Sequence, residues 1–143
     1  MTEQDNPPSA MAYGAALQGL GINIIVRDID RAHFFVTEIL SAETRFRTDK
    51  FAAMRLCGDD FMLHVDDTYR NNPLIGSLTA DSPRGVGVEL RAYAVNPDQA
   101  EARARALGFT VLAGSMDKPH GMRECMILDD DGYVWIPSLP QSG

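Results

Sequence analysis

The chain has 143 residues, of which 45% are hydrophobic and 23% are charged, a size and composition typical of one folded domain with a substantial core. Its 13 basic and 20 acidic side chains give a formal net charge of -7, which excludes nucleic acid as an expected partner because phosphates are repelled. No apolar run approaches the roughly 20 residues of a membrane helix, and the first residues lack the layout of a signal peptide. We therefore expect a cytoplasmic protein without a membrane partner.

The first half of the chain is predicted to contain one helix and four strands. Residues 1–16 hold two prolines and show no periodicity, which indicates a flexible N-terminal arm. A strand is expected over residues 20–26, and Asp28 is expected to cap a helix that runs through about Leu40, with Asp30 near the positive end of the helix dipole. Further strands are expected over residues 44–47, 51–56 and 61–65, with a hairpin turn at residues 58–60.

The second half repeats this order after a polar segment. Residues 67–84 are rich in Asn, Pro, Gly and Ser and are interpreted as a linker. A strand is then expected over residues 86–94, and a helix from Asn96, with a capping-box arrangement, to Gly108. Strands at residues 109–113, 122–128 and 133–136 follow, the last one after a turn at residues 129–132.

The two halves therefore have the same predicted order, β-α-β-β-β, which indicates an internal repeat. The sequence predicts an α+β fold of two βαβββ modules, residues 17–66 and 85–138, followed by a tail at residues 139–143. We expect the modules to form a curved mixed sheet around a pocket for a small molecule.

Four stretches of sequence resemble the vicinal oxygen chelate superfamily, which includes glyoxalase I, bleomycin-resistance proteins and extradiol dioxygenases. Residues 26–30 (VRDID) and 35–41 (FVTEILS) resemble its V-x-D-x-D turn and its FY-x-x-x-LG helix end, with Val36 and Ser41 in place of Tyr and Gly. Residues 104–109 (ARALGF) and 128–133 (LDDDGY) resemble its second helix end and its closing DPDG turn. The resemblance covers about residues 20–137 and implies the glyoxalase/bleomycin-resistance-like fold.

Strand alternation predicts which side chains face away from the helices. In the first strand, Ile22, Ile24 and Val26 are assigned to the core and Gly21, Asn23 and Ile25 to the concave side. In the equivalent strand of the second half, Val88, Leu90, Ala92 and Ala94 are assigned to the core and Glu89, Arg91 and Tyr93 to the concave side. Three polar side chains on one face of an apolar strand are costly to bury unless they pair with each other or with a ligand. Two interpretations remain open. Either this face is solvated and Glu89 and Arg91 form an ordinary ion pair, or the three side chains bind a polar ligand.

Histidines and aromatic residues add further candidates. His64 shares a face with Met62, opposite the apolar row of Phe61, Leu63 and Val65, and is expected to converge with Glu89. His33 is assigned to the solvent edge of the first helix and His120 to the rim of the pocket. Either Tyr133 and Trp135 or Val134 and Ile136 line the pocket, and alternation alone leaves both open.

The resemblance also implies where metal ligands stand in metal-dependent relatives. Gly21 and Glu89 occupy the two ligand positions on the early strands of the two halves. Ile136 occupies the position after the closing turn at which metal-dependent relatives have a Glu ligand. Only His64 and Glu89 remain as side chains with donor atoms, too few for a tightly held ion. We therefore expect no metal and no other cofactor. The two cysteines, Cys57 and Cys125, lie in apolar stretches without CxxC spacing and are expected to be reduced packing residues.

Three functions are consistent with these residues. The first is a metal-free homodimer, as the resemblance implies, that binds a small polar-aromatic molecule, such as an antibiotic, and sequesters it. Its expected ligand-binding residues are Asn23, His64, Glu89, Arg91, Tyr93, Glu124 and Trp135; residues 120–124 (HGMRE) resemble the G-x-R-E stretch of bleomycin-resistance proteins. The second is a glyoxalase-like lyase or isomerase with an atypical metal site, or with Glu89 or His64 as general base. A purely structural dimer module is the third.

Overall fold

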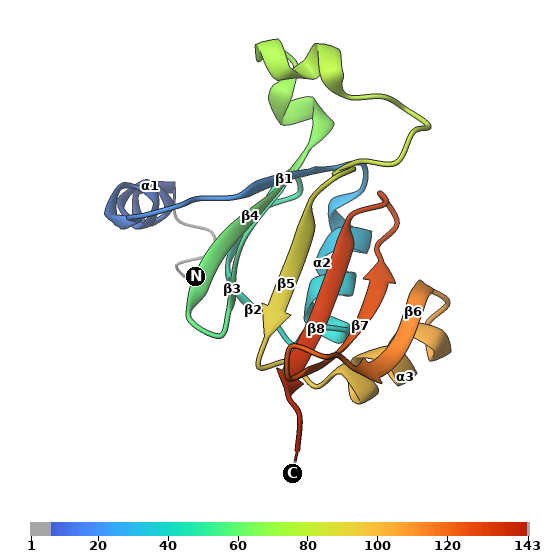
Figure 1. The fold of residues 1–143 in the computed structure, drawn as a ribbon. Coiled ribbons are helices and arrows are strands. Elements are labelled where there is room, and N and C mark those ends of the chain that lie inside the picture. The colour runs from blue at the N-terminus through green and yellow to red at the C-terminus, as the bar shows by residue number, and fades with distance from the viewer. Residues whose placement is uncertain (1–6, 143) are drawn as a thin grey trace. The chain divides into compact units, whose positions relative to one another are not determined.

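The computed structural model describes residues 7–142 and contains two four-stranded mixed sheets (Figure 1). The chain packs as two compact units, one formed by Met1–His33 with Ala42–Leu78 and the other by Phe34–Ser41 with Thr79–Gly143. Each unit holds one sheet, and helices are few, so the predicted α+β class is confirmed. No helix within the described residues is long and apolar enough to cross a membrane.

The first sheet has the strand order β1-β4-β3-β2, formed by β1 (Asn23–Val26), β2 (Glu43–Arg47), β3 (Phe51–Leu56) and β4 (Asp59–Val65). β1 runs parallel to β4, and the other neighbours are antiparallel. The β3–β4 turn consists of Cys57 and Gly58, with φ of 49° and 92°, and Leu56 pairs with Asp59. Two residues with positive φ make the turn whose twist matches a hairpin. The predicted turn at 58–60 was one residue late.

Side-chain alternation in this sheet agrees with the prediction for β4 and departs from it in β1. Phe61 and Leu63 are buried, and His64 and Met62 on the other face are half-buried. Ile22, assigned to the core, is 41% exposed because it precedes the strand, whereas Ile25, assigned to the concave side, is 4% exposed. A strand of four residues offers too few positions for alternation to be read securely.

α2 (Ile29–Glu38) begins as predicted, because the Asp28 carboxylate accepts the backbone N–H of Arg31 at 3.1 Å. It ends two residues before the predicted Leu40. Ser41 then adopts φ of 60°, the left-handed conformation that glycine usually supplies after a helix. In the second unit, Phe35 is buried, and its ring centroid lies 5.0 Å from that of Phe109.

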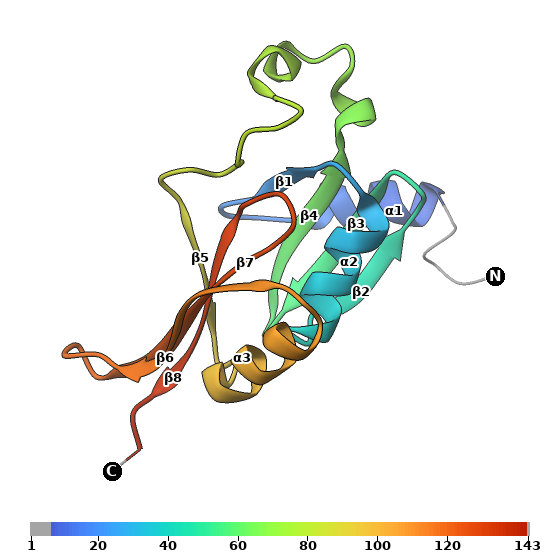
Figure 2. The same ribbon diagram turned by 90° about the vertical axis from the view of Figure 1, so that its right-hand side faces the viewer.

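The second sheet has the order β5-β8-β7-β6, formed by β5 (Glu89–Tyr93), β6 (Thr110–Asp117), β7 (Met122–Leu128) and β8 (Val134–Pro140). α3 (Pro97–Ala106) packs on β6, β7 and β8 (Figure 2). The Asn96 side chain accepts the Gln99 backbone N–H, which confirms the predicted cap. Against α3, the buried Cys125 donates to the Pro97 carbonyl oxygen at 3.5 Å.

Several predicted bounds change in the structure. β5 starts at Glu89 instead of residue 86, because Gly85 and Gly87 have positive φ of 70° and 88° and interrupt an extended strand. β8 continues to Pro140 and so includes the start of the predicted tail. Both cysteines are free, but Cys57 is exposed in its turn, so the prediction that it packs in the interior was wrong.

Two segments without predicted secondary structure contain helices. Residues 7–16, within the predicted arm, form α1 (Pro7–Ala16), while residues 1–6 lie outside the described residues. Two short 3-10 helices, η2 (Asp66–Tyr69) and η3 (Pro73–Ser77), lie in the predicted linker, except that η2 starts one residue before it. η2 brings Tyr69 back to the first sheet.

Candidate functional site

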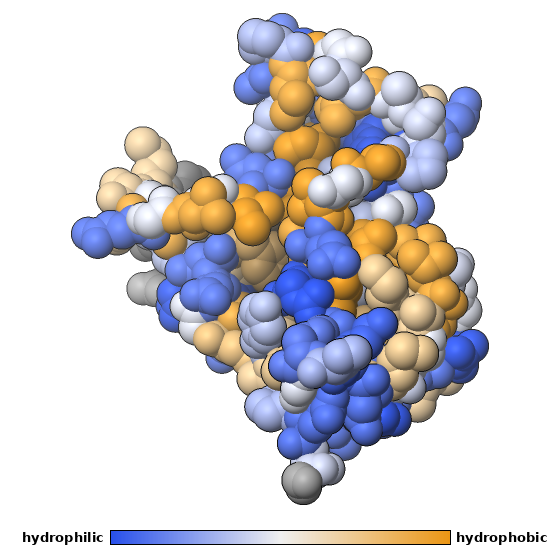
Figure 3. Space-filling model, in the orientation of Figure 1, coloured by the Kyte–Doolittle hydropathy of each residue, from blue (hydrophilic) through white to orange (hydrophobic). Residues whose placement is uncertain are grey.

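One face of the second sheet carries the polar row predicted on β5. The register pairs Glu89 with Val134, Arg91 with Ile136 and Tyr93 with Ser138, and paired residues of neighbouring strands share a face. Arg123 and Cys125, on the opposite face of β7, contact the helix α3. The polar row therefore lies on the face that α3 leaves uncovered. Figure 3 shows hydrophilic side chains gathered over β5 and β8.

Arg91 is bound by two carboxylates on this face. Its guanidinium donates to Glu124 of β7 and, at 3.2 Å, to Glu89. The two acids differ in burial, because the side chain of Glu124 is 8% exposed and that of Glu89 is 53% exposed. His120 Nε2 lies 3.7 Å from the other oxygen of Glu124. The Arg91 guanidinium also lies 5.8 Å from the centre of the Tyr93 ring.

Ser138 completes this group and was missed by sequence reasoning. It pairs with Tyr93 on one side and with Glu124 on the other, and it is fully buried. Its hydroxyl has no hydrogen-bond partner among the described residues, a situation that costs roughly 1–3 kcal/mol. The available signal was a single hydroxyl in the apolar run 134–139 (VWIPSL). We call Glu89, Arg91, Tyr93, Glu124 and Ser138 the second-sheet site.

Trp135 does not join the second-sheet site. It pairs with Leu90, so it projects to the opposite face, where its ring lies 6.2 Å from that of Phe35 and its indole N–H donates to Asp129. Burial raises the pKa of Asp129 to about 6, against the lowering effect of the Trp135 hydrogen bond. Of the two pairs that the sequence left open, Val134 and Ile136 share the face of Glu89 and Arg91.

The first sheet holds a second group around His64. Its ring stacks on Phe51, with centroids 5.6 Å apart and planes at 16°, and meets the Tyr69 ring edge-on at 5.8 Å. The Asn23 amide donates to the Tyr69 hydroxyl at 3.4 Å. Burial alone lowers the pKa of His64, which keeps the imidazole neutral near pH 7. We call Asn23, Phe51, His64 and Tyr69 the first-sheet site; its predicted convergence with Glu89 stays a prediction.

The contacts that place Tyr69 come from η2 and the start of β3. Lys50 pairs with Asp67 at 2.6 Å, and Arg70 pairs with the other oxygen of Asp67 at 2.8 Å. The Thr68 hydroxyl donates to the Val65 carbonyl oxygen. Nothing in the local sequence revealed this role of Tyr69, because η2 lies in a segment interpreted as a linker.

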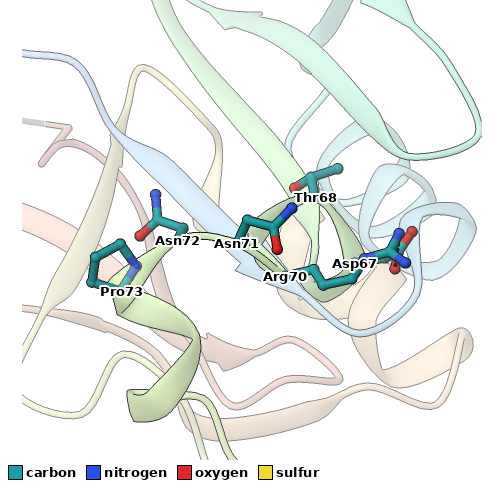
Figure 4. A pocket seen from close by; sticks show the side chains of 6 residues that line it. All are labelled: Asp67, Thr68, Arg70, Asn71, Asn72 and Pro73. Carbon is teal, nitrogen blue, oxygen red and sulfur yellow. Dashed lines mark ion pairs between the residues drawn. The ribbon is translucent and has the colours of Figure 1, made fainter.

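A polar hollow of about 490 Å³ adjoins this turn (Figure 4). The residues that line the hollow are all polar except for one proline. They are Asp67, Thr68, Arg70, Asn71, Asn72 and Pro73. Asp67 and Arg70 neutralise each other, and Asn72 accepts the Leu74 backbone N–H. Pockets for small organic molecules are mostly apolar, so this hollow is a poor candidate for the predicted ligand.

The remaining histidine has a structural position. His33 Nε2 lies 2.7 Å from the Thr44 hydroxyl, and Arg47 lies 3.3 Å from its Nδ1. Burial, followed by the charge of Arg47, lowers its pKa. The half-buried His33 therefore connects α2 to β2. The prediction that it lies at the solvent edge was wrong.

The donor atoms of the chain do not fit a metal site of the kind that the resemblance implies. Within residues 7–142 there is no group of three or more His, Cys, Asp or Glu side chains that could hold an ion. Gly21 has no side chain, and Ile136 is buried and apolar. We derive no chemistry through a metal.

Comparisons with known proteins agree on the fold. No family model and no curated protein sequence matches the chain. A glyoxalase/bleomycin resistance protein/dioxygenase family enzyme from Burkholderia phytofirmans PsJN superposes with a TM-score of 0.71 at 15% identity, over 85% of this chain and 97% of that one. The chain has the glyoxalase/bleomycin-resistance fold.

Two further solved structures share the glyoxalase/bleomycin-resistance fold. A glyoxalase-related enzyme from Fulvimarina pelagi has a TM-score of 0.67 at 18% identity, over 85% of this chain and 87% of that one. The fosfomycin resistance protein FosX from Listeria monocytogenes has a TM-score of 0.63 at 18% identity, over 87% and 95%. At such identities the likeness concerns the fold alone, so function must be argued from the site.

Proposed function

We propose that this protein binds a small polar-aromatic molecule with a positive charge at the second-sheet site, and that it does so without a metal. The observation that carries the proposal is the Glu124 carboxylate, which is nearly buried and is paired with Arg91 on the sheet face that α3 leaves uncovered. Buried charges on a face without a covering helix are expensive to maintain for stability alone. They are typical of a surface that recognises a ligand.

The charge of the site favours a cation. Two carboxylates, Glu89 and Glu124, surround one guanidinium, Arg91, so one negative charge is left uncompensated. Tyr93 adds an exposed aromatic ring on the same face, and cations bind favourably over such a ring. Together these groups fit an aromatic ring that carries an amidinium, ammonium or similar group.

Sequestration of an antibiotic is the role that we propose for this binding. A fosfomycin resistance protein is among the proteins with this fold, and a binding site that holds its ligand without reacting needs no activated nucleophile or metal. We infer binding, rather than turnover, from the donor set described above.

The test uses the purified full chain and benzamidine, a cationic aromatic probe, with benzamide as its neutral counterpart of the same shape. The NMR signals of His120, whose Nε2 lies 3.7 Å from Glu124, are expected to show benzamidine binding at the second-sheet site at least ten-fold tighter than benzamide. Glu124→Gln should weaken benzamidine binding at least five-fold, whereas Arg105→Ala, which removes an exposed guanidinium of α3, should not. Equal binding of both probes at this site, or an equal effect of the two variants, contradicts the proposal. Bleomycin is the first antibiotic to test in the same way.

The competing enzymatic function has its own test. If the chain is a glyoxalase-like lyase or isomerase, the purified protein turns over a glutathione hemithioacetal, and Glu89→Gln or His64→Gln lowers the rate at least 100-fold. We expect no turnover. Stoichiometric zinc, nickel, iron or manganese in the purified protein contradicts a metal-free function.

We also propose that the protein forms a homodimer through exposed apolar residues beside edge strands. β1 and β5 are edge strands of their sheets. Leu20 and Ile22 before β1 are 90% and 41% exposed, and Val86 and Val88 before β5 are 82% and 53% exposed. Figure 3 shows apolar side chains along the segment that leads into β1. Light scattering is expected to give a mass of about 31 kDa, twice the 15.7 kDa of the chain, and Leu20→Glu should give a monomer.

A further inference from the structure

The first sheet carries polar groups that the proposed function does not use. His64 is held by two aromatic rings, Phe51 and Tyr69, so its orientation is fixed. Neither of its ring nitrogens has a hydrogen-bond partner among the described residues, and neither belongs to the buried unpartnered atoms. Neither nitrogen of the half-buried His64 is therefore completely buried.

The protonation state of His64 defines what these nitrogens offer. Burial lowers the pKa of His64, and no charged group contributes to the shift. A neutral imidazole presents one N–H donor and one lone-pair acceptor. No charged group is in place beside it to compensate a charged ligand.

Asn23 and Tyr69 add a second anchor next to this ring. Asn23 and His64 lie on the same face, because Asn23 pairs with Met62 and Ile25 pairs with His64. The Asn23 Nδ2 is directed to the Tyr69 hydroxyl, which leaves its carbonyl oxygen as an acceptor. Tyr69 is in turn held in place by the Lys50–Asp67 ion pair at the start of η2.

We propose that the first-sheet site binds an uncharged aromatic or heteroaromatic ring that carries a hydrogen-bond donor and an acceptor, with His64 and Asn23 as its contacts. The aromatic class follows from the rings of Phe51 and Tyr69, which prefer offset or edge-to-face contacts with another ring. The ligand is expected to be uncharged because no charged group contributes to the pKa shift of His64, so none is in place to compensate a charge on the ligand. Tyr69 is a positioning residue, because its hydroxyl orients the Asn23 amide. The proposal is independent of the second-sheet site.

The experiment follows the imidazole signals of the full chain by NMR after labelling of its three histidines. Benzamide is titrated, with cyclohexanecarboxamide as the non-aromatic control and benzamidine as the charged control. Benzamide should shift the His64 signals saturably and bind at least ten-fold tighter than either control does at His64. His120, 3.7 Å from Glu124, reports the second-sheet site in the same spectra, and His33 serves as the reference.

Variants separate direct contact from positioning. Asn23→Ala should weaken benzamide binding at the first-sheet site at least five-fold, as read from the His64 signals. His64→Gln should do the same, as read from the ring signals of Phe51 after labelling of the phenylalanines. Tyr69→Phe keeps the ring and the fold but removes the hydroxyl, so it should weaken binding about three-fold with an unchanged melting temperature. Asn71→Ala, an exposed neighbour in the same connection, should have no effect.

The results separate the two proposals. Unshifted His64 signals at saturating benzamide, or equal binding by Tyr69→Phe, Asn23→Ala and the unchanged protein, would overturn the first-sheet proposal. A benzamidine response confined to His120 would leave the second-sheet proposal intact in that case. If His64→Gln does not fold, Asn23→Ala and Tyr69→Phe carry the test.

Discussion

Arg91 and Glu124 form an ion pair across the middle of the second sheet, although they are 33 residues apart in the chain. Arg91 lies on β5 and Glu124 on β7, and β8 runs between them. The pair is unequal, since the side chain of Arg91 is 26% exposed and that of Glu124 is 8% exposed. Loss of either partner therefore has different consequences from loss of a surface pair.

Glu124→Gln is expected to lower the free energy of unfolding by roughly 1–3 kcal/mol, because it leaves the partly buried Arg91 guanidinium with only the exposed Glu89 as a charged partner. The matched change Glu89→Gln, at a side chain that is 53% exposed, should cost about 0.5 kcal/mol or less. Urea unfolding of both variants measures the difference. Equal losses would show that burial of Glu124 has no energetic weight.

Acidification is expected to destabilise the protein through His33 and His64. Both have a folded-state pKa below the usual 6.5, chiefly because of burial. The folded state therefore binds fewer protons than the unfolded state, and stability is lost as the pH falls below 6.5. His33→Gln retains a neutral donor and acceptor but does not titrate, so its unfolding free energy should depend less steeply on pH below 6.5. An unchanged slope contradicts the assignment.

Asp129 contributes a pH dependence of the opposite sign. Burial raises its pKa from 3.8 to about 6, so the stability associated with its protonated form is fully present below pH 3.8 and is lost as the pH rises through about 6. Its carboxylate accepts the indole N–H of Trp135, the one tryptophan of the chain. Tryptophan fluorescence of the folded protein should therefore change with a midpoint near pH 6.

The matched variant for this titration is Asp129→Asn. The Asn oxygen can still accept the backbone N–H groups of Asp131, Gly132 and Tyr133, which bind one oxygen of Asp129. The Asn amide nitrogen takes the place of the oxygen that accepts the Trp135 indole N–H, so that one hydrogen bond is lost. The fluorescence change near pH 6 should disappear while the fold is retained. If the change persists, another group titrates near Trp135.

Gly85 and Gly87 provide a paired test of packing at the entry to β5. Both have positive φ, of 70° and 88°, so alanine is strained at either position by roughly 1 kcal/mol. A Cβ at Gly85 would collide with the Tyr133 ring, whereas one at Gly87 meets nothing within 4 Å. Gly85→Ala should therefore destabilise the protein by roughly 1–3 kcal/mol more than Gly87→Ala in urea unfolding. Equal losses of stability in the two variants would mean that only the strained backbone, and not the contact with Tyr133, destabilises Gly85→Ala.

Local features were read from the sequence with most success where they depend on few residues. The bounds of β3 and β7 match the predicted strands, and both Asp28 and Asn96 cap helices as expected. Capping and alternation act within about four residues, so a single sequence contains the information. β5 starts later than predicted because Gly85 and Gly87, both with positive φ, precede it.

The sequence by itself determined the repeated β-α-β-β-β order and the polar row on β5, because both follow from local periodicity. Only the tertiary structure decided that Glu124 reaches Arg91, that Ser138 is buried between Tyr93 and Glu124, and that Tyr69 packs on His64. These partners depend on which strands are neighbours, on their register and on the path of the chain after β4. Such long-range relationships result from packing as a whole and leave no periodic signal in the sequence.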